Sequence, residues 1–134
     1  MRQNDLLIRN ENIQRLFDWY LKGDFIVNRK YQRKLVWTIE EKQQFINSIL
    51  SDYPVPLFLL AITSESRYEI IDGMQRLNAI FAFIKGEYSV NFNGQEGYFD
   101  LQTMAVTKEL MDTGIYIQKV PLLDRTLCLS LIHI

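Results

Sequence analysis

The chain has 134 residues, a length that suits one domain with its own hydrophobic core. Its net charge of −1 excludes a strongly basic protein whose overall field attracts nucleic acid, but allows a local basic patch. The single cysteine excludes an internal disulfide, and no apolar run approaches the roughly 20 residues needed to span a bilayer. Because the N-terminus is also too polar for a signal peptide, these features predict a cytoplasmic protein without a membrane partner.

Four segments have the apolar spacing of a helix. They are expected at 9–22, at 74–85, at 103–114 and in a segment that begins at residue 39. The proline-containing segment 52–56 ends the helix that begins at 39. Thr38 and Glu41 form the pattern of a capping box, which places the start of the second helix at residue 39. Gly23 and Gly86 are the residues at which the first and third helices should end.

Short apolar or alternating segments between these helices predict strands. They are expected at 24–28, 57–63, 67–71, 88–92, 97–100 and 115–123. A short turn joins 57–63 to 67–71 and predicts a hairpin, and Asn93-Gly94 predicts a second one. The whole arrangement predicts an α+β fold, with a small mixed sheet and helices packed on it.

The last six residues, LSLIHI at 129–134, read as foreign to the protein. They are the in-frame translation of CTGTCTCTTATACACATC, a transposase adaptor used in sequencing libraries; a chance hexapeptide is the alternative. We therefore assign 1–128 to one domain and expect the native chain to continue beyond it. Cys128 and His133 are set aside as functional candidates for the same reason.

The segment IIDGMQRL, at 70–77, places polar groups at the turn between an apolar strand and a helix. The first N–H groups of a helix lack helical partners and, with the helix dipole, attract an anion such as phosphate. Gly73 lets the backbone approach such a ligand, and Arg76 offers a planar fork for two phosphate oxygens. Asp72 suits a Mg²⁺ ion or a water molecule, and Gln75 suits orienting that water. The alternative is that Asp72 only caps the helix and pairs with Arg76.

A second polar cluster precedes the helix expected from residue 39. Its members are Tyr31, Gln32, Arg33 and Trp37. Arg33 offers another phosphate fork, and Tyr31 or Trp37 offers a flat face for a base. The alternative is an aromatic loop that covers the core, with Trp37 buried and the neighbouring basic side chains solvated.

Together, the segments KYQRKLVWTIEEKQQFINSILSDYPVPLFLL and YEIIDGMQRLNAI resemble the N-terminal domain of GmrSD-type modification-dependent restriction endonucleases. That domain belongs to the ParB/sulfiredoxin-like superfamily, and the resemblance covers roughly residues 10–125. It implies an α+β fold with a nucleotide site at the strand-to-helix turn, and hydrolysis of a nucleoside triphosphate (NTP) with a divalent metal such as Mg²⁺. It also implies a role in bacterial phage defence, with DNA as a partner and cleavage by an HNH-type nuclease domain that these residues do not contain.

By motif position, the resemblance makes Asp72 and Gln75 catalytic candidates, with Asp72 also a metal ligand. The nucleotide-binding candidates are Tyr31, Gln32, Arg33, Trp37, Gly73 and Arg76. Met74 stands where family members often have Gln or Lys, and where sulfiredoxin chemistry needs a cysteine, so the sulfiredoxin branch is excluded.

The leading hypothesis is therefore an NTP-binding and NTP-hydrolysing regulatory domain of a modification-dependent restriction system. The alternative is a ParB-like DNA-binding or nucleotide-sensing module without turnover, in which the basic residues of 29–34 contact DNA phosphates. A third interpretation is a structural scaffold whose polar turns are only helix caps.

Overall fold

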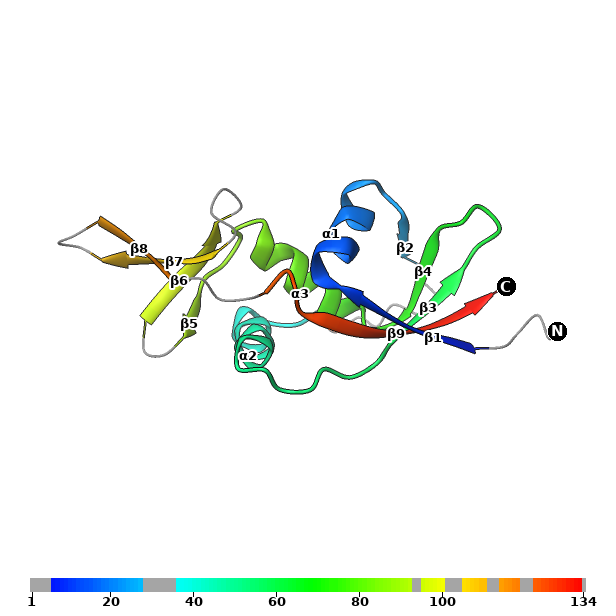
Figure 1. Cartoon of the computed structure of the whole chain (residues 1–134), viewed down its shortest axis with the longest axis horizontal. Coiled ribbons are helices and arrows are strands. Elements are labelled where there is room, and N and C mark those ends of the chain that lie inside the picture. The colour runs from blue at the N-terminus through cyan, green and yellow to red at the C-terminus, as the bar shows by residue number, and fades with distance from the viewer. Residues whose placement is uncertain are drawn as a thin grey trace. The chain divides into compact units, whose positions relative to one another are not determined.

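The structure is a computed structural model of the chain and describes residues 6–27, 36–92, 95–100, 105–110, 114–118 and 122–133. The chain divides into two compact units. We call the first the mixed-sheet unit; it comprises Met1–Val36, Val55–Met74 and Asp124–Ile134. The second is the antiparallel-sheet unit, which comprises Trp37–Pro54 and Gln75–Leu123. The predicted α+β class is confirmed, because helices and a five-stranded mixed sheet are both present (Figure 1).

The mixed-sheet unit contains a five-stranded sheet and one helix in its described residues. Its elements are β1 (Leu6–Asn12), α1 (Ile13–Leu21), β2 (Phe25–Val27), β3 (Phe58–Ile62), β4 (Tyr68–Asp72) and β9 (Thr126–His133). The strand order is β1-β9-β3-β4-β2. Strand β9 runs antiparallel to β1 and parallel to β3, β3 runs antiparallel to β4, and β2 runs parallel to β4. The two ends of the chain are therefore neighbouring strands, as Figure 1 shows.

Helix α1 is fixed to this sheet by its start and by one aromatic face. The backbone N–H of Ile13 donates to the carbonyl oxygen of Arg125, at 3.0 Å. The indole of Trp19 stacks on the Tyr68 ring of β4, with centroids 4.3 Å apart, and meets Phe25 of β2 edge-on. Because Trp19 is buried, this contact removes a large apolar surface from water.

The antiparallel-sheet unit combines two helices with a second sheet. Its elements are α2 (Ile39–Leu50), α3 (Met74–Ile84), β5 (Val90–Phe92), β6 (Gln95–Asp100), β7 (Ala105–Leu110) and β8 (Gly114–Gln118). The strands follow one another in the order β5-β6-β7-β8, and every neighbouring pair is antiparallel. Helix α3 begins at Met74, the last residue of the segment Val55–Met74 of the mixed-sheet unit, and its other residues belong to the antiparallel-sheet unit.

Helix α2 begins where the sequence predicts, because its capping box is complete. The Thr38 hydroxyl accepts from the N–H of Glu41 at 3.2 Å, and the Glu41 carboxylate accepts from the N–H of Thr38 at 3.0 Å. Further along the helix, the Gln43 amide donates to the carbonyl oxygen of Ser89 at 2.8 Å. The Ser89 hydroxyl donates to Glu96 of β6 at 2.6 Å, so a polar chain links α2 to the start of the sheet.

Helix α3 is apolar over most of its surface, which is typical of a core helix. Its buried residues are Leu77, Ala79, Ile80, Phe81, Ala82, Phe83 and Ile84. The Phe83 ring is fully buried and lies near the rings of Tyr88 and Phe99. The Tyr88 hydroxyl donates to the carbonyl oxygen of Ala79. Burial, with a smaller contribution from the charge of Glu87, raises the pKa of Tyr88 well above its ordinary value.

Several predicted elements are confirmed. The second and third helices and both hairpins are present, although Asn93-Gly94 of the second turn lies outside the described residues. The helix expected at 9–22 is shorter, because Leu6–Asn12 forms β1 and α1 starts at Ile13 behind its Asn12 cap. The strand expected at 115–123 is shorter: β8 covers Gly114–Gln118, 119–121 lie outside the described residues, and 122–123 are not in a strand.

The helix expected at 103–114 is wrong. Ala105–Leu110 is strand β7, and β8 starts at Gly114. Strand β7 is paired on both sides, with β6 and with β8. Pairing of this kind outweighs a segment's own weak preference for helix, particularly one that contains Val106 and Thr107.

Strand β9 was not predicted, because residues 129–134 read as foreign to the protein. It lies between β1 and β3, and its residues Leu127, Leu129 and Leu131 are buried. Sheet pairing does not bear on the origin of the last six residues, so their assignment to an adaptor stays a prediction. Among the described residues, no helix combines the length and apolar character required to cross a lipid bilayer.

Candidate functional site

The candidate site is the turn that joins strand β4 to helix α3. Strand β4 ends at Asp72, whose side chain is exposed, and α3 begins two residues later at Met74. Between them, Gly73 is buried and has a φ of 110°. Residues with a Cβ atom rarely adopt this dihedral, so the turn requires a glycine at this position. The strand, the glycine and the helix start are confirmed where the sequence places them.

The first turn of α3 carries Gln75 and Arg76, both half-buried. The Oε1 atom of Gln75 accepts a hydrogen bond of 3.1 Å from the backbone N–H of Trp37. Because this N–H needs an acceptor, the contact fixes which end of the Gln75 amide is oxygen. The amide nitrogen Nε2 carries the two N–H donors of the side chain and takes no part in this hydrogen bond.

This hydrogen bond brings together two segments that lie far apart in the sequence. Trp37 immediately precedes the cap of α2, and Gln75 lies 38 positions further along the chain. The Trp37 ring is half-buried and packs edge-on against Phe45 of α2, with centroids 5.5 Å apart. The start of α2 and the start of α3 are thus joined inside the antiparallel-sheet unit.

Three residues predicted for the site, Tyr31, Gln32 and Arg33, lie outside the described residues. Their assignment to nucleotide binding stays a prediction. For Trp37, the sequence pattern points to the ring, which offers a flat face for a base. The structure adds a role for its backbone N–H, which no sequence pattern could reveal because every residue except proline has one.

Asp72 is the carboxylate at this turn that could ligate a metal ion. Among the described residues, no three His, Cys, Asp or Glu side chains are grouped so that they could hold a metal by themselves. Mg²⁺ is commonly bound by one or two carboxylates, water and the phosphates of a substrate. The exposed Asp72 carboxylate at the end of β4 is a donor of this kind.

The Gln75–Trp37 contact predicts a measurable effect on stability. Replacement of Gln75 by leucine leaves the part-buried Trp37 N–H without its acceptor and should lower the free energy of unfolding by about 1–2 kcal/mol. Gln75→Glu keeps an oxygen acceptor and should stay close to wild type. Urea denaturation of both variants checks this, with Gln44→Leu on the exposed face of α2 as the matched control. Equal stability of Gln75→Leu and Gln44→Leu would contradict the assigned role of the contact.

Comparison with protein families identifies one matching model. It is described as GmrSD restriction endonuclease, N-terminal domain, and it matches residues 2–126. The match contains both the segment around Trp37 and the turn at Asp72. Comparison with curated proteins and with solved structures gave no match.

Proposed function

Because the chain belongs to the family of GmrSD restriction endonuclease N-terminal domains, we propose that it binds and hydrolyses a nucleoside triphosphate as the regulatory part of a restriction system. In this proposal the triphosphate binds at the β4–α3 turn. The observation that carries it is the hydrogen bond between Trp37 and Gln75, because it joins the two segments on which the family resemblance rests.

The start of α3 supplies the groups that would hold the phosphates. The first N–H groups of a helix have no partner within the helix, and the helix dipole favours negative charge there. Gly73 carries no side chain, so its backbone leaves room for a phosphate oxygen to approach. Arg76 follows in the first turn, where its guanidinium can donate two parallel hydrogen bonds to one phosphate.

Gln75 has two functions in this proposal, one for each end of its amide. Its oxygen holds the backbone at Trp37, and its nitrogen donates to an oxygen of the terminal phosphate or to the attacking water. The nucleotide is thereby connected to the segment before α2, where the flat ring of Trp37 contacts the base. The family signature places Tyr31, Gln32 and Arg33 in the same segment, and we assign them to the nucleotide from the resemblance alone.

Asp72 is the acidic group of the site. We assign it to Mg²⁺ and to the attacking water; the ion would neutralise charge on the phosphate oxygens when bound. The water oxygen forms a bond to the γ-phosphorus while the bond to the bridging oxygen breaks, which gives a nucleoside diphosphate and inorganic phosphate. Asp72 accepts a hydrogen bond from the water and holds it in line, because placement and charge stabilisation dominate phosphoryl transfer.

The partners follow from the family rather than from any contact in this chain. We assign cleavage to an HNH-type nuclease domain or subunit, with modified DNA as its substrate. The role of the present chain is to couple its nucleotide state to that nuclease.

The deciding experiment is calorimetric titration of the chain with ATP, GTP, CTP and UTP in the presence of Mg²⁺, together with an assay of phosphate release. Saturable binding of at least one nucleotide, followed by its hydrolysis, is expected. Binding without hydrolysis would reduce the proposal to a nucleotide sensor. Absence of binding for all four nucleotides would overturn it.

A further inference from the structure

Strand β1 forms one edge of the five-stranded sheet. Its inner side pairs with β9 along its whole length, from Leu6 opposite Ile132 to Asn12 opposite Thr126. The strand order places no described strand on its outer side, and Figure 1 shows β1 at the margin of this sheet. An edge strand has unpaired backbone N–H and carbonyl groups along its outer side, and these can pair with a strand of another chain.

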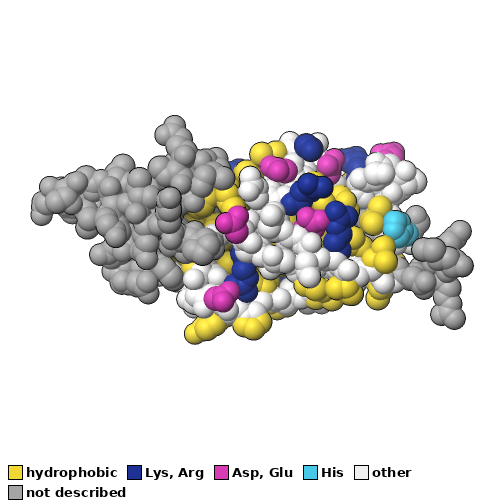
Figure 2. All heavy atoms as spheres, viewed as in Figure 1, with side chains coloured by type: hydrophobic (Ala, Val, Ile, Leu, Met, Phe, Trp, Pro, Cys, Tyr) yellow, Lys and Arg dark blue, Asp and Glu magenta, His cyan; other side chains and the backbone are white. Residues whose placement is uncertain are grey.

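Three consecutive large apolar residues are exposed on β1. Leu6, Leu7 and Ile8 have exposed fractions of 57%, 48% and 64%. Figure 2 shows hydrophobic side chains gathered in the part of this face where Figure 1 places β1 and β9. Natural edge strands are commonly short, or are protected by proline, a bulge or charged side chains. The edge strand β2 has only three residues, whereas β1 has seven, contains no proline and pairs with β9 without a bulge.

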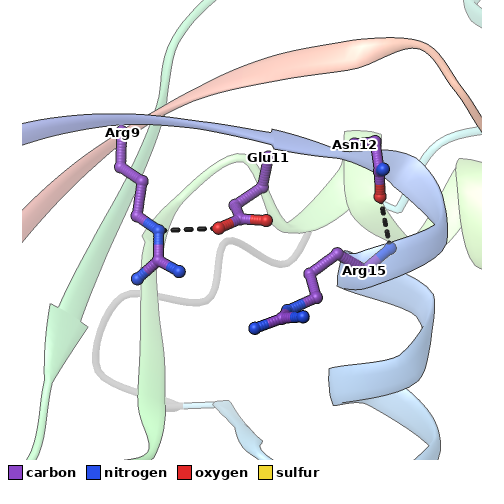
Figure 3. A network of polar contacts seen from close by, with 4 residues as sticks. All are labelled: Arg9, Glu11, Asn12 and Arg15. Carbon is purple, nitrogen blue, oxygen red and sulfur yellow. Dashed lines mark hydrogen bonds and ion pairs between the residues drawn. The ribbon is translucent and has the colours of Figure 1, made fainter.

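The two charged residues of β1 do not protect its outer side. Figure 3 shows the side chains of Arg9 and Glu11 leaving the same face of the strand, on the side of α1. The Nε of Arg9 donates to Oε1 of Glu11 at 2.6 Å, and its Cζ lies 5.8 Å from the centroid of the Trp19 ring of α1. The charge of Arg9 is therefore engaged within its own chain, and the segment 6–8 carries no charge.

The exposed apolar residues of β1 lie on both faces of the sheet. Side chains alternate along a strand, so Leu7 is on the same face as Arg9, whose guanidinium contacts Trp19 of α1. Leu6 and Ile8 therefore lie on the other face. A helix or a membrane packed on one face would cover only one of these two sets. A strand added alongside β1 places side chains on both faces, so the surface fits a strand.

We propose that β1 pairs antiparallel with β1 of a second copy of this chain, about a twofold axis at Leu7. An axis perpendicular to the sheet keeps the faces of the two copies aligned. Leu7 then lies opposite Leu7 of the second copy, and Leu6 lies opposite Ile8 of the second copy, so each exposed apolar residue meets an apolar partner. An axis at Ile8 would instead place Leu7 opposite Arg9, and an axis at Arg9 would place two guanidinium groups opposite each other.

The same strand pairs in both copies, so the assembly closes at two chains. Each chain has a net charge of only −1, so the two copies repel each other weakly. The proposal does not depend on nucleotide binding.

The test exchanges charges at position 7 and measures the mass of the 134-residue chain by sedimentation equilibrium. The wild-type chain should form dimers as its concentration rises from about 10 µM to about 1 mM, because a short interface is weak. Leu7→Lys places two like charges opposite each other at the axis and should weaken the dimer at least about tenfold, as should Leu7→Glu. An equimolar mixture of the two variants places opposite charges there and should restore dimers. That result is expected only where position 7 faces itself.

Val27→Lys is the matched control, because Val27 is exposed on β2, at the opposite edge of the same sheet. Its dimer affinity should equal that of the wild-type chain. Urea denaturation of each variant separates loss of pairing from loss of folding, and replacement of the half-exposed Leu7 should cost little stability. A wild-type chain that stays monomeric throughout the range would overturn the proposal. Single variants that dimerise as well as the wild type, or a mixture that stays monomeric, would overturn it too.

Discussion

The Asp72→Ala and Arg76→Ala variants should each hydrolyse nucleoside triphosphates at least about a hundredfold more slowly than the wild-type chain. Removal of one group that stabilises charge in a transition state typically costs about 10²–10³ in rate. Asp72 is the last residue of β4, and Arg76 lies in the first turn of α3. The two therefore lie on either side of Gly73 along the chain. Steady-state phosphate release with Mg²⁺ measures the effect.

The two variants should differ in which kinetic constant changes. Arg76 would contact phosphate in the bound substrate as well as in the transition state, so Arg76→Ala should raise KM and lower kcat. Asp72 acts on the metal and the water, so Asp72→Ala should lower kcat with a smaller change in nucleotide affinity. Direct titration with a non-hydrolysable analogue checks the affinities independently of turnover.

Matched variants on the same helix provide the controls. Arg76→Lys retains the charge but loses the planar fork, so its activity should fall between those of wild type and Arg76→Ala. Asn78 is exposed on α3 two positions further on, and Asn78→Ala should have no effect on turnover. Wild-type turnover in both Asp72→Ala and Arg76→Ala would remove the proposed mechanism.

Replacement of Gly73 by alanine should damage both stability and nucleotide binding. A φ of 110° is strained for a residue with a Cβ atom, and such strain costs on the order of 1–3 kcal/mol. If the backbone shifts to relieve it, the N–H groups that start α3 move away from the phosphate position. We therefore expect a lower free energy of unfolding in urea, and nucleotide affinity that falls at least about tenfold at temperatures where the variant is folded.

Gly86 offers the matched control for this variant. It follows α3 at the opposite end and also has a positive φ, of 78°. A Cβ atom built there meets nothing within 4 Å, so Gly86→Ala should cost about 1 kcal/mol for its backbone conformation alone. Nucleotide affinity should stay at the wild-type value. Equal affinities of the Gly73→Ala and Gly86→Ala variants would show that the turn does not bind the nucleotide.

The parts of the candidate site that depend on residues adjacent in the sequence were largely predicted from it. The strand, the glycine and the helix start at 70–77 are consecutive, and each has a local signal: an apolar alternation, a residue without Cβ and a helical spacing. The contact of Gln75 with Trp37 could not be predicted, because its donor is a backbone N–H, which every residue except proline has. Only the folding of the chain brings that donor to an amide 38 positions further along.

The same distinction separates the correct and incorrect parts of the fold prediction. The capping box of Thr38 and Glu41 and the hairpin of β3 and β4 are decided within a few residues of chain, and both are confirmed. Strand β7 looked helical in isolation and is a strand because β6 and β8 pair with it. Strand β1 also depends on its partner: Leu6 lies opposite Ile132, at the other end of the chain.

By itself, the sequence determined the family, the α+β class, the capping box of α2 and the polar turn, because each depends on residues close together in the chain or on a motif they form. The tertiary structure alone decided the order of the strands, the pairing of the two chain ends and the joining of the two helix starts. Those features depend on hydrogen bonds that involve backbone groups far apart in the sequence. Because nearly every residue has the same backbone donor and acceptor, residue identity does not say which of them pair.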